Sequence, residues 1–287
     1  MSQRLGYLAL AGSVALLNLQ ILAQPIPYKP TAEDAVPPAI LGQAGAPMGE
    51  PLAYYPANAK TLGYLAQPQG DGSDTRAKGA VILIHEWNGL VDRVRQVADA
   101  FAAEGYLALA VDLYSGRTGS NRDENMALVG ETLAQPEEII RNLDAAAHYL
   151  KSRLGENEGG STKVAAIGWC YGGGVALSYA LGSKNHDATA IFYGRLLDDP
   201  EQMKHIHHEI YGTFAGLDKG IPPAQVDAFV AALRKAGVPN DVHIYDDVKH
   251  GFWLHVDRDP ETNLAPALNA WQRLKAYLER NLNLRSL

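Results

Sequence analysis

The sequence predicts an α/β fold in which a mostly parallel, doubly wound sheet carries helices on both faces. Short, uninterrupted aliphatic runs, such as residues 80–84, are typical of strands that are buried on both sides of a parallel sheet. The stretches between these runs are longer and carry apolar residues at helical spacing, for example Val94, Val97 and Phe101. Strands that alternate with helices of this length pack into such a sheet.

The aliphatic runs and the helical spacing of apolar residues predict the individual strands and helices in chain order. Tyrosines and leucines within residues 52–66 favour one or two antiparallel edge strands ahead of the central sheet. Gly105 and Gly237 lie just past helical patterns, and prolines mark the first turn of the last two helices. We expect central strands at residues 80–84, 106–111, 164–167, 188–193, 210–215 and 241–245, and helices at about 92–104, 124–133, 136–154, 175–181, 222–236 and 260–281.

The N-terminal segment predicts export of the protein. Arg4 is followed by an apolar run up to residue 23, and this pattern is typical of a secretory signal peptide over residues 1–23. An uncleaved membrane anchor is the alternative, because the run approaches the length of a membrane span. Residues 24–51 are rich in Pro, Ala and Gly and predict a linker arm, and residues 52–287 are expected to form a single domain. We therefore expect a periplasmic or secreted protein without stable membrane association after cleavage.

Composition and charge narrow the class of partner. The 287 residues are 47% hydrophobic and 20% charged, which is ordinary globular composition. The formal net charge of −7 and a pI near 5.7, without any basic stripe, argue against nucleic-acid binding. A single cysteine rules out an intramolecular disulfide. The sequence is compatible with a monomer or a small homo-oligomer.

Cys170 lies where the predicted strand at 164–167 gives way to a helix, within the sequence Gly-Trp-Cys-Tyr-Gly-Gly. Gly168 and Gly172 let neighbouring backbone pass close by, so Cys170 can occupy the apex of a sharp strand-to-helix turn. Such a turn is the nucleophile elbow of the α/β-hydrolase fold, with sulfur in place of the usual serine oxygen. The N-terminus of the following helix favours a thiolate. A buried structural cysteine beside a glycine-rich bend is the alternative.

Two further reactive side chains follow predicted strands, Asp218 after residues 210–215 and His250 after residues 241–245. Together with Cys170 they give the order nucleophile, acid, histidine, which is the order along the chain in α/β-hydrolases. His250 would accept the thiol proton and Asp218 would orient the imidazole. Asp246 and Asp247 are the alternatives for the acid.

Four segments together resemble the dienelactone hydrolase family: residues 84–89 (Ile-His-Glu-Trp-Asn-Gly), 111–114 (Val-Asp-Leu-Tyr), 168–173 and 249–252 (Lys-His-Gly-Phe). The similarity extends from about residue 79 to residue 282. The resemblance implies a single-domain α/β-hydrolase without a large cap domain, a Cys-His-Asp triad, and no metal or cofactor. It also implies hydrolysis of a small ester or lactone, as by a carboxymethylenebutenolidase, through an acyl-thioester.

The resemblance assigns roles to three more residues. In the family the glutamate of the first segment lies beside the nucleophile and manages the thiol proton before substrate arrives, and Glu86 matches its position. A loop carboxylate without a catalytic role is the alternative. For the oxyanion, the family pattern and the elbow geometry both indicate the backbone N–H groups of Trp87 and Tyr171.

The sequence departs from the family pattern at the substrate. Family members that act on dienelactone carry two arginines that bind its carboxylate. Arg117 approximately matches the first, with Arg122 as the alternative, whereas no arginine occupies the second position. An apolar rim that includes Trp87, Trp169 and Trp253 would favour neutral aromatic or short acyl esters, unless these tryptophans belong to the core.

Two other functions fit the same fold. One is a broad-specificity carboxylesterase, which would differ only in its pocket. The other is a non-catalytic binding protein or redox sensor that uses Cys170 as an oxidisable thiol. A positioned histidine and acid argue against the sensor, which needs a reactive thiol but no oriented base.

Overall fold

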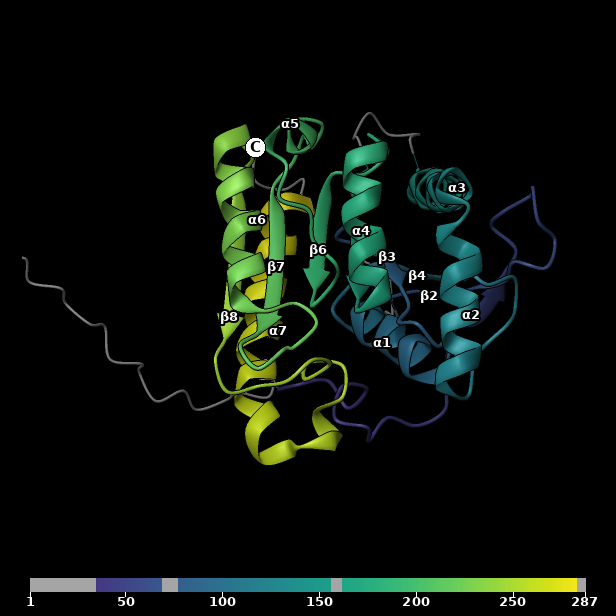
Figure 1. Cartoon of the computed structure of the whole chain (residues 1–287). Coiled ribbons are helices and arrows are strands. Elements are labelled where there is room, and N and C mark those ends of the chain that lie inside the picture. The colour runs from purple at the N-terminus through teal and green to yellow at the C-terminus, as the bar shows by residue number, and fades with distance from the viewer. Residues whose placement is uncertain (1–34, 69–76, 156–161, 283–287) are drawn as a thin grey trace, which may run out of the picture.

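The computed structural model of the chain describes residues 35–68, 77–155 and 162–282 and contains an eight-stranded sheet (Figure 1). The strand order is β1-β2-β4-β3-β5-β6-β7-β8. β1 pairs antiparallel with β2 and β2 with β4, and the remaining neighbours are parallel. The strands are β1 (Glu50–Leu52), β2 (Gly63–Ala66), β3 (Ala80–Ile84), β4 (Leu107–Val111), β5 (Val164–Trp169), β6 (Ala188–Phe192), β7 (Ile210–Ala215) and β8 (Asn240–Tyr245).

Helices cover both faces of this sheet. α1 and α7 share one buried cluster with side chains from one face of the strands, and α3, α4 and α6 pack on the other face (Figure 1). Alternate side chains of β3 illustrate the division, since Val81 and Leu83 join the first cluster and Ile82 joins the second. The helices are α1 (Asp92–Ala103), α2 (Arg122–Leu133), α3 (Pro136–Leu154), α4 (Tyr171–Gly182), α5 (Pro200–Met203), α6 (Pro223–Ala236) and α7 (Pro260–Leu282), with a 3₁₀ helix at Val256–Arg258.

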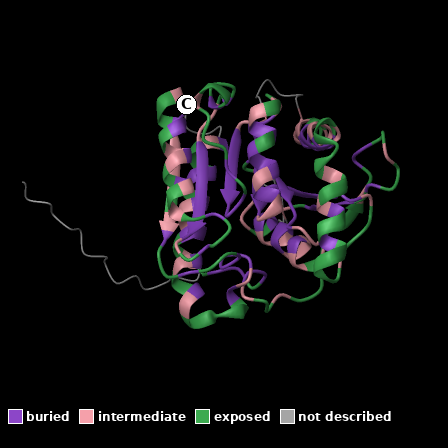
Figure 2. Ribbon diagram, viewed as in Figure 1, coloured by how far each residue is buried: buried purple, intermediate pink, exposed green. Residues whose placement is uncertain are grey.

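Burial explains the sequence pattern of the central strands. β3, β4, β5, β6 and β7 are buried along their whole length, so they carry continuous apolar runs. β8 is only partly buried because it lies at the edge of the sheet. Most helices have one buried face and one exposed face, as Figure 2 shows.

The predicted α/β-hydrolase fold is confirmed, and the predicted central strands agree with the structure to within two residues at each end. The sequence analysis did not predict two short elements, α5 and the 3₁₀ helix at Val256–Arg258. Both are too short to show a helical period in the sequence.

The predicted linker arm over residues 24–51 is wrong for its second half. Val36, Ala39 and Ile40 are buried in the core, and β1 begins at residue 50. The side chain of Arg93 donates hydrogen bonds to the carbonyl oxygens of Ala39 (3.0 Å) and Ile40 (3.3 Å), which ties this segment to α1. Residues 36–40 show no helical or strand periodicity in the sequence, and yet three apolar side chains among prolines attach this segment to the core.

The predicted signal peptide over residues 1–23 lies outside the described residues. Within the described part of the chain, the helices are too short or too polar to span a membrane.

The six strands β3 to β8 run in one direction, so their carboxyl ends meet at one edge of the sheet. Loops that follow these strands therefore gather at this edge, where ligands bind in open α/β sheets.

Candidate active site

Cys170 is the residue between β5 and α4, and its backbone is strained. It has φ 55° and ψ −116°, a conformation that L side chains rarely adopt. Two glycines make the turn possible by allowing close packing. A Cβ atom on Gly168 would lie 2.0 Å from the carbonyl oxygen of Gly172, and one on Gly172 would lie 2.2 Å from that of Ile84. The geometry is that of the strand-turn-helix predicted from the sequence.

The structure brings His250 and Asp218 together from the ends of β8 and β7. The His250 Nδ1 atom lies 2.6 Å from Asp218 Oδ2, and the Asp218 side chain is 3% exposed. The other carboxylate oxygen of Asp218 accepts hydrogen bonds from the N–H groups of Gly220 (2.8 Å) and Ile221 (3.2 Å). These bonds fix the carboxylate, which in turn orients the imidazole. The alternatives Asp246 and Asp247 make no hydrogen bond with His250 in the described structure.

The pKa values within this group favour charge separation. Burial opposes the charged form of His250, but hydrogen bonds and negative charge from Asp218 and Cys170 outweigh burial and raise its pKa to about 10. Burial would raise the pKa of Asp218, yet the hydrogen bond and charge of His250 lower it below its ordinary value. The arrangement therefore stabilises the imidazolium form of His250 beside the Asp218 carboxylate.

Glu86 is bound by a histidine that the sequence analysis did not consider. Its Oε2 atom lies 2.7 Å from Nε2 of His255, and both side chains are largely buried. Among the described residues Glu86 forms no hydrogen bond with Cys170, and its role in managing the thiol proton stays a prediction. His255 directly follows residues 252–254, the stretch where the family's second arginine would fall.

The backbone N–H group of Trp87, which is predicted to bind the oxyanion, lies in a turn that side-chain hydrogen bonds hold in place. Nδ1 of the buried His85 donates to the carbonyl oxygen of Glu86 (2.6 Å), while its Nε2 accepts from the N–H of Leu113 (3.2 Å). Burial lowers the pKa of His85, which keeps the ring neutral and able to accept. The hydroxyl of Tyr114 donates to the carbonyl oxygen of Trp87 (3.1 Å). These contacts hold the peptide groups around Trp87 at the edge of the sheet.

A cavity of about 530 Å³ opens beside the thiol. Cys170, His250 and Trp87 line it on one side, and apolar side chains of α2 line another. Met126 and Leu133 of α2 are about half exposed, although both are large and apolar. An apolar cavity with a few convergent polar groups is the usual form of a small-molecule site.

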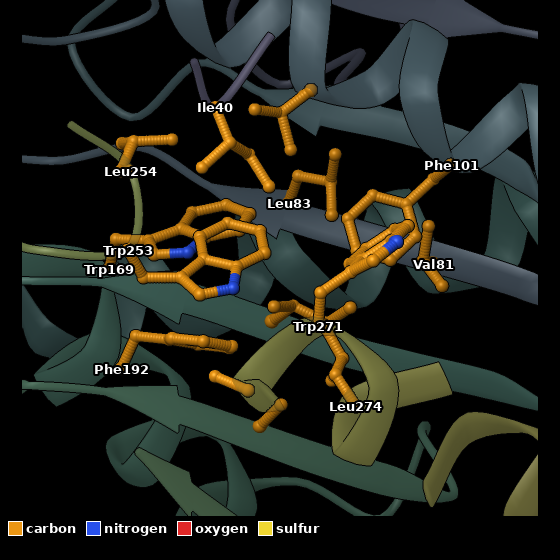
Figure 3. Close-up of a cluster of buried hydrophobic side chains, with 14 of the residues drawn as sticks. Ile40, Val81, Leu83, Phe101, Trp169, Phe192, Trp253, Leu254, Trp271 and Leu274 are labelled. Carbon is orange, nitrogen blue, oxygen red and sulfur yellow. The ribbon is translucent and has the colours of Figure 1, made fainter. Parts of the chain in front are cut away.

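Two residues predicted to bind substrate lie elsewhere. The guanidinium of Arg117 forms an ion pair with Glu131 (2.6 Å) and donates to the carbonyl oxygen of Tyr114, and it does not line the cavity beside Cys170. Trp253 is fully buried and stacks on Trp169, with ring centroids 5.5 Å apart (Figure 3). Both expectations are wrong. Arg117 is paired with the nearby carboxylate of Glu131. Trp169 and Trp253 belong to the core, whereas Trp87 lines the cavity.

Tyr193 is a site residue that the sequence analysis missed. It follows β6, lines the cavity and has φ 38°, so it is a second strained residue beside the thiol. Its ring lies 4.9 Å from that of His250 between centroids, and its hydroxyl accepts a hydrogen bond from the N–H of Leu254 (3.2 Å). A tyrosine at the end of a predicted strand was the available signal, but nothing in its neighbours indicated the contact with His250.

Several known proteins resemble this chain in sequence or in fold. Residues 62–282 match the model of the dienelactone hydrolase family. A protein of Escherichia coli O157:H7 named "Putative carboxymethylenebutenolidase" is 27% identical over 259 residues, which cover 83% of this chain and 93% of that protein. Among solved structures, a dienelactone hydrolase-like promiscuous phosphotriesterase from metagenomic libraries has a TM-score of 0.68 at 19% identity and covers 83% of this chain and 99% of its own. A thermophilic esterase from Thermogutta terrifontis with bound propionate has a TM-score of 0.61 at 16% identity, covering 82% and 96%.

Proposed function

The chain belongs to the dienelactone hydrolase family, and from this we propose that it hydrolyses a small ester or lactone through an acyl-thioester on Cys170. The observation that carries the proposal is the position of Cys170. Its thiol stands on a strained turn at the start of α4 and lines the same cavity as His250, a histidine that Asp218 orients. A thiol in such a place is activated as a nucleophile.

In the acylation half, the Cys170 thiolate attacks the carbonyl carbon of the substrate. The carbonyl oxygen becomes an oxyanion, which accepts hydrogen bonds from the backbone N–H groups of Trp87 and Tyr171. The tetrahedral intermediate then collapses as the carbon–oxygen bond to the alcohol breaks. His250 is an imidazolium at neutral pH and gives its proton to the departing oxygen.

In the deacylation half, His250 is neutral and takes a proton from water as the water oxygen attacks the thioester carbonyl. The carbon–sulfur bond breaks, the acid product leaves, and the thiolate and imidazolium are restored. Asp218 stays ionised throughout, because its hydrogen bonds to Gly220, Ile221 and His250 favour the carboxylate. The residues used are those of the chain itself, and the cycle is balanced by one water molecule.

The test is the mass of the intact protein after a brief mix with p-nitrophenyl acetate, with Cys170→Ala as the matched variant. We expect an acetyl adduct that forms and decays in the native protein and is absent from the variant. A tryptic digest would place the adduct on the peptide that contains Cys170.

Release of p-nitrophenol without a Cys170 adduct, or equal turnover by Cys170→Ala, would overturn the thioester mechanism. Absence of both adduct and turnover with acetates and lactones would favour the redox-sensor alternative. Reversible oxidation of Cys170 by dilute peroxide would then be the next measurement.

The apolar cavity supports a second possibility, the broad-specificity carboxylesterase. Met126, Val129 and Leu133 of α2 offer an apolar wall to acyl or aryl groups of several sizes. A series of p-nitrophenyl esters of increasing chain length separates the two functions. A flat profile of kcat/KM indicates the broad esterase, and a sharp optimum indicates a dedicated substrate.

We also propose that the protein is exported, since an apolar run follows Arg4 and ends near residue 23. Expression of the full chain, followed by fractionation and N-terminal sequencing, tests this. A mature protein in the cytosol that keeps Met1 would contradict the proposal.

A further inference from the structure

We propose that His85 and Tyr114 are positioning residues for the reaction, because they direct the backbone N–H of Trp87 into the cavity beside Cys170 and hold it there. The proposal rests on the proposed function and adds two residues to it. Both side chains are buried, with exposed fractions of 0% and 1%. Neither lines the cavity, so both act through the peptide groups on the two sides of Trp87.

Two backbone N–H groups at the cavity are free to bind an oxyanion. Trp87 and Tyr171 both line the cavity, and the N–H of each donates to no acceptor in the described part of the chain. Most backbone N–H groups away from solvent are paired, so these two are available to a ligand. The start of α4 fixes the N–H of Tyr171. Trp87 lies in a turn after β3, and other contacts must hold the direction of its N–H.

His85 sets the direction of the Trp87 N–H through the peptide group that joins Glu86 to Trp87. This peptide is trans, so its C=O and its N–H point in opposite directions. Nδ1 of the buried His85 ring donates to the carbonyl oxygen of Glu86 (2.6 Å), and the N–H of Gly89 donates to the same oxygen at 3.3 Å. The Trp87 N–H is therefore directed away from the buried ring. Hydrogen bonding at the carbonyl also polarises the peptide, which makes its N–H a stronger donor.

The loop after β4 fixes the tautomer of His85. The backbone N–H of Leu113 donates to Nε2 of His85 (3.2 Å), so the proton of the neutral ring is on Nδ1. The carboxylate of Asp112 holds this loop, since it accepts hydrogen bonds from the N–H groups of Tyr114 (2.9 Å) and Gly116 (2.6 Å). His85 is thereby kept as a hydrogen-bond donor at Nδ1.

Tyr114 holds the next peptide group along the chain. Its hydroxyl donates to the carbonyl oxygen of Trp87 (3.1 Å), and its ring packs against His85 with 4.6 Å between centroids. The peptide groups before and after the Cα atom of Trp87 are therefore both fixed. The same turn lies against the nucleophile elbow, because a Cβ atom on Gly172 would be 2.2 Å from the carbonyl oxygen of Ile84 and 2.6 Å from that of His85. A donor that is in place before the charge develops stabilises the transition state.

The experiment compares two reactions of the same thiol, one that forms an oxyanion and one that does not. When p-nitrophenyl acetate acetylates Cys170, the sulfur–carbon bond forms as the carbonyl π electrons move to oxygen. Alkylation by iodoacetamide displaces iodide from a saturated carbon and needs no oxyanion donor. The readout for each protein is the ratio of the acetylation rate constant to the alkylation rate constant. Release of p-nitrophenol with the enzyme in excess gives the first, and the mass of the intact protein gives the second.

His85→Ala should lower this ratio by about 10- to 100-fold, and Tyr114→Phe by roughly tenfold. Loss of an oxyanion donor costs about 10²–10³ in kcat, and here the donor is kept but its direction is no longer fixed. His85→Asn should recover most of the loss, because its Nδ2 can donate in place of Nδ1. Ratios within about twofold of the native value in both His85→Ala and Tyr114→Phe would overturn the proposal.

His186→Ala and Tyr179→Phe are the matched controls. His186 is a buried histidine whose Nε2 lies 3.0 Å from Oγ1 of Thr189. Tyr179 is a buried tyrosine whose hydroxyl donates to Asp144 (2.9 Å). Neither lines the cavity, so any loosening of the fold that they cause should slow both reactions alike and leave the ratio within about twofold of the native value. An equal fall of the ratio in these controls would show a general structural effect and overturn the proposal.

A second readout separates this proposal from the proposed function. Pentyl trifluoromethyl ketone adds a thiolate reversibly and forms an oxyanion without a leaving group, so it protects Cys170 from iodoacetamide even if no ester is hydrolysed. Half-protection should need about tenfold more ketone in His85→Ala and Tyr114→Phe than in the native protein. Such a shift supports the positioning role even if the acetyl adduct never forms. Equal protection in all three proteins, or none in the native protein, would overturn it.

Discussion

At the level of single residues, strain and charge are concentrated around one thiol. Cys170 and Tyr193 both have positive φ, which costs of order 1–3 kcal/mol for a residue with a side chain. Both line the same cavity, and the ring of Tyr193 packs on His250. Close packing of the backbone around Gly168 and Gly172 maintains the strain at Cys170, because it leaves the turn no space in which to adopt another conformation.

Asp218→Asn should show how far the acid controls His250. Asp218 favours the imidazolium through its hydrogen bond and its charge, so its removal lowers the pKa of His250 from about 10. The proton that His250 gives to the leaving group is then lost at lower pH. We expect the alkaline limb of kcat/KM to move down by roughly 1–3 pH units and the maximal rate to fall by roughly 10²–10⁴.

The measurement is the pH profile of p-nitrophenyl acetate hydrolysis from pH ~6 to ~11, corrected for the uncatalysed reaction. Asp246→Asn and Asp247→Asn are the controls, since both are acids near the end of β8 without a bond to His250. A full-activity Asp218→Asn with an unmoved alkaline limb would assign the acid to one of these two residues.

Glu86 and His255 should act as a unit in the reaction. Their side chains are 2.7 Å apart and largely buried, so the loss of either leaves the other without its partner. Glu86→Gln should slow turnover by about tenfold, and His255→Ala by a similar factor. Because both changes break the same interaction, the double variant should be little slower than either single one.

A double-mutant cycle on kcat/KM and on the pH profile checks this coupling. The expected interaction energy is about 0.5–3 kcal/mol. Multiplicative effects of the two substitutions would mean that Glu86 acts without His255. His243→Ala provides a control, because His243 is a histidine of the edge strand β8 that does not contact Glu86.

At the level of elements, the sequence predicted which side chains follow the strands. It did not predict which residues from other segments form hydrogen bonds with them. Cys170 directly follows the buried strand β5, Asp218 lies in the loop after β7 and His250 in the loop after the edge strand β8, so the topology of the parallel sheet brought them together. The contacts of Glu86 with His255 and of Arg117 with Glu131 join residues 169 and 14 positions apart. Such pairs depend on loop conformations, and no periodicity in the sequence encodes them.

Gly172→Ala should disrupt the turn between β5 and α4. Its new Cβ would lie 2.2 Å from the carbonyl oxygen of Ile84, which is part of the central strand β3 and cannot move away freely. We expect a loss of at least ~2 kcal/mol in the free energy of unfolding and a large loss of thiol reactivity. Urea denaturation and the rate of alkylation by iodoacetamide measure the two effects.

Gly130→Ala is the matched control for that substitution. Gly130 lies inside α2, and a Cβ there meets no atom within 4 Å. The change should stabilise the protein by about 0.5–1 kcal/mol, because alanine is the better helix former. A Gly172→Ala protein as stable as the native one would show that the elbow can open without loss.

At the level of the whole molecule, the order of strands and helices was predictable because β3 to β7 are buried, mostly apolar strands that alternate with helices. The packing of residues 36–40 was not. This segment lies among prolines and small residues and has no period of its own. Local turn hydrogen bonds, such as that from the N–H of Ile40 to the carbonyl oxygen of Pro37 (2.9 Å), stabilise it. Tertiary contacts add to them, including the hydrogen bond from the N–H of Val256 to the carbonyl oxygen of Ile40 (3.2 Å).

Ile40→Ala tests whether this segment is a structural part of the domain. The side chain of Ile40 is fully buried near Leu254 and the stacked tryptophans (Figure 3), so its truncation leaves a cavity in the core. We expect a loss of about 2–5 kcal/mol in the free energy of unfolding, measured by urea denaturation.

Met48→Ala is the control from the same predicted linker, because Met48 is 73% exposed and its loss should change stability by no more than about 0.5 kcal/mol. Equal stability of the two variants would show that residues 36–40 behave in solution as the linker predicted from the sequence. A selective loss in Ile40→Ala would extend the domain N-terminally and tie its stability to the segment that carries His255, since Ile40 bonds to the neighbouring Val256.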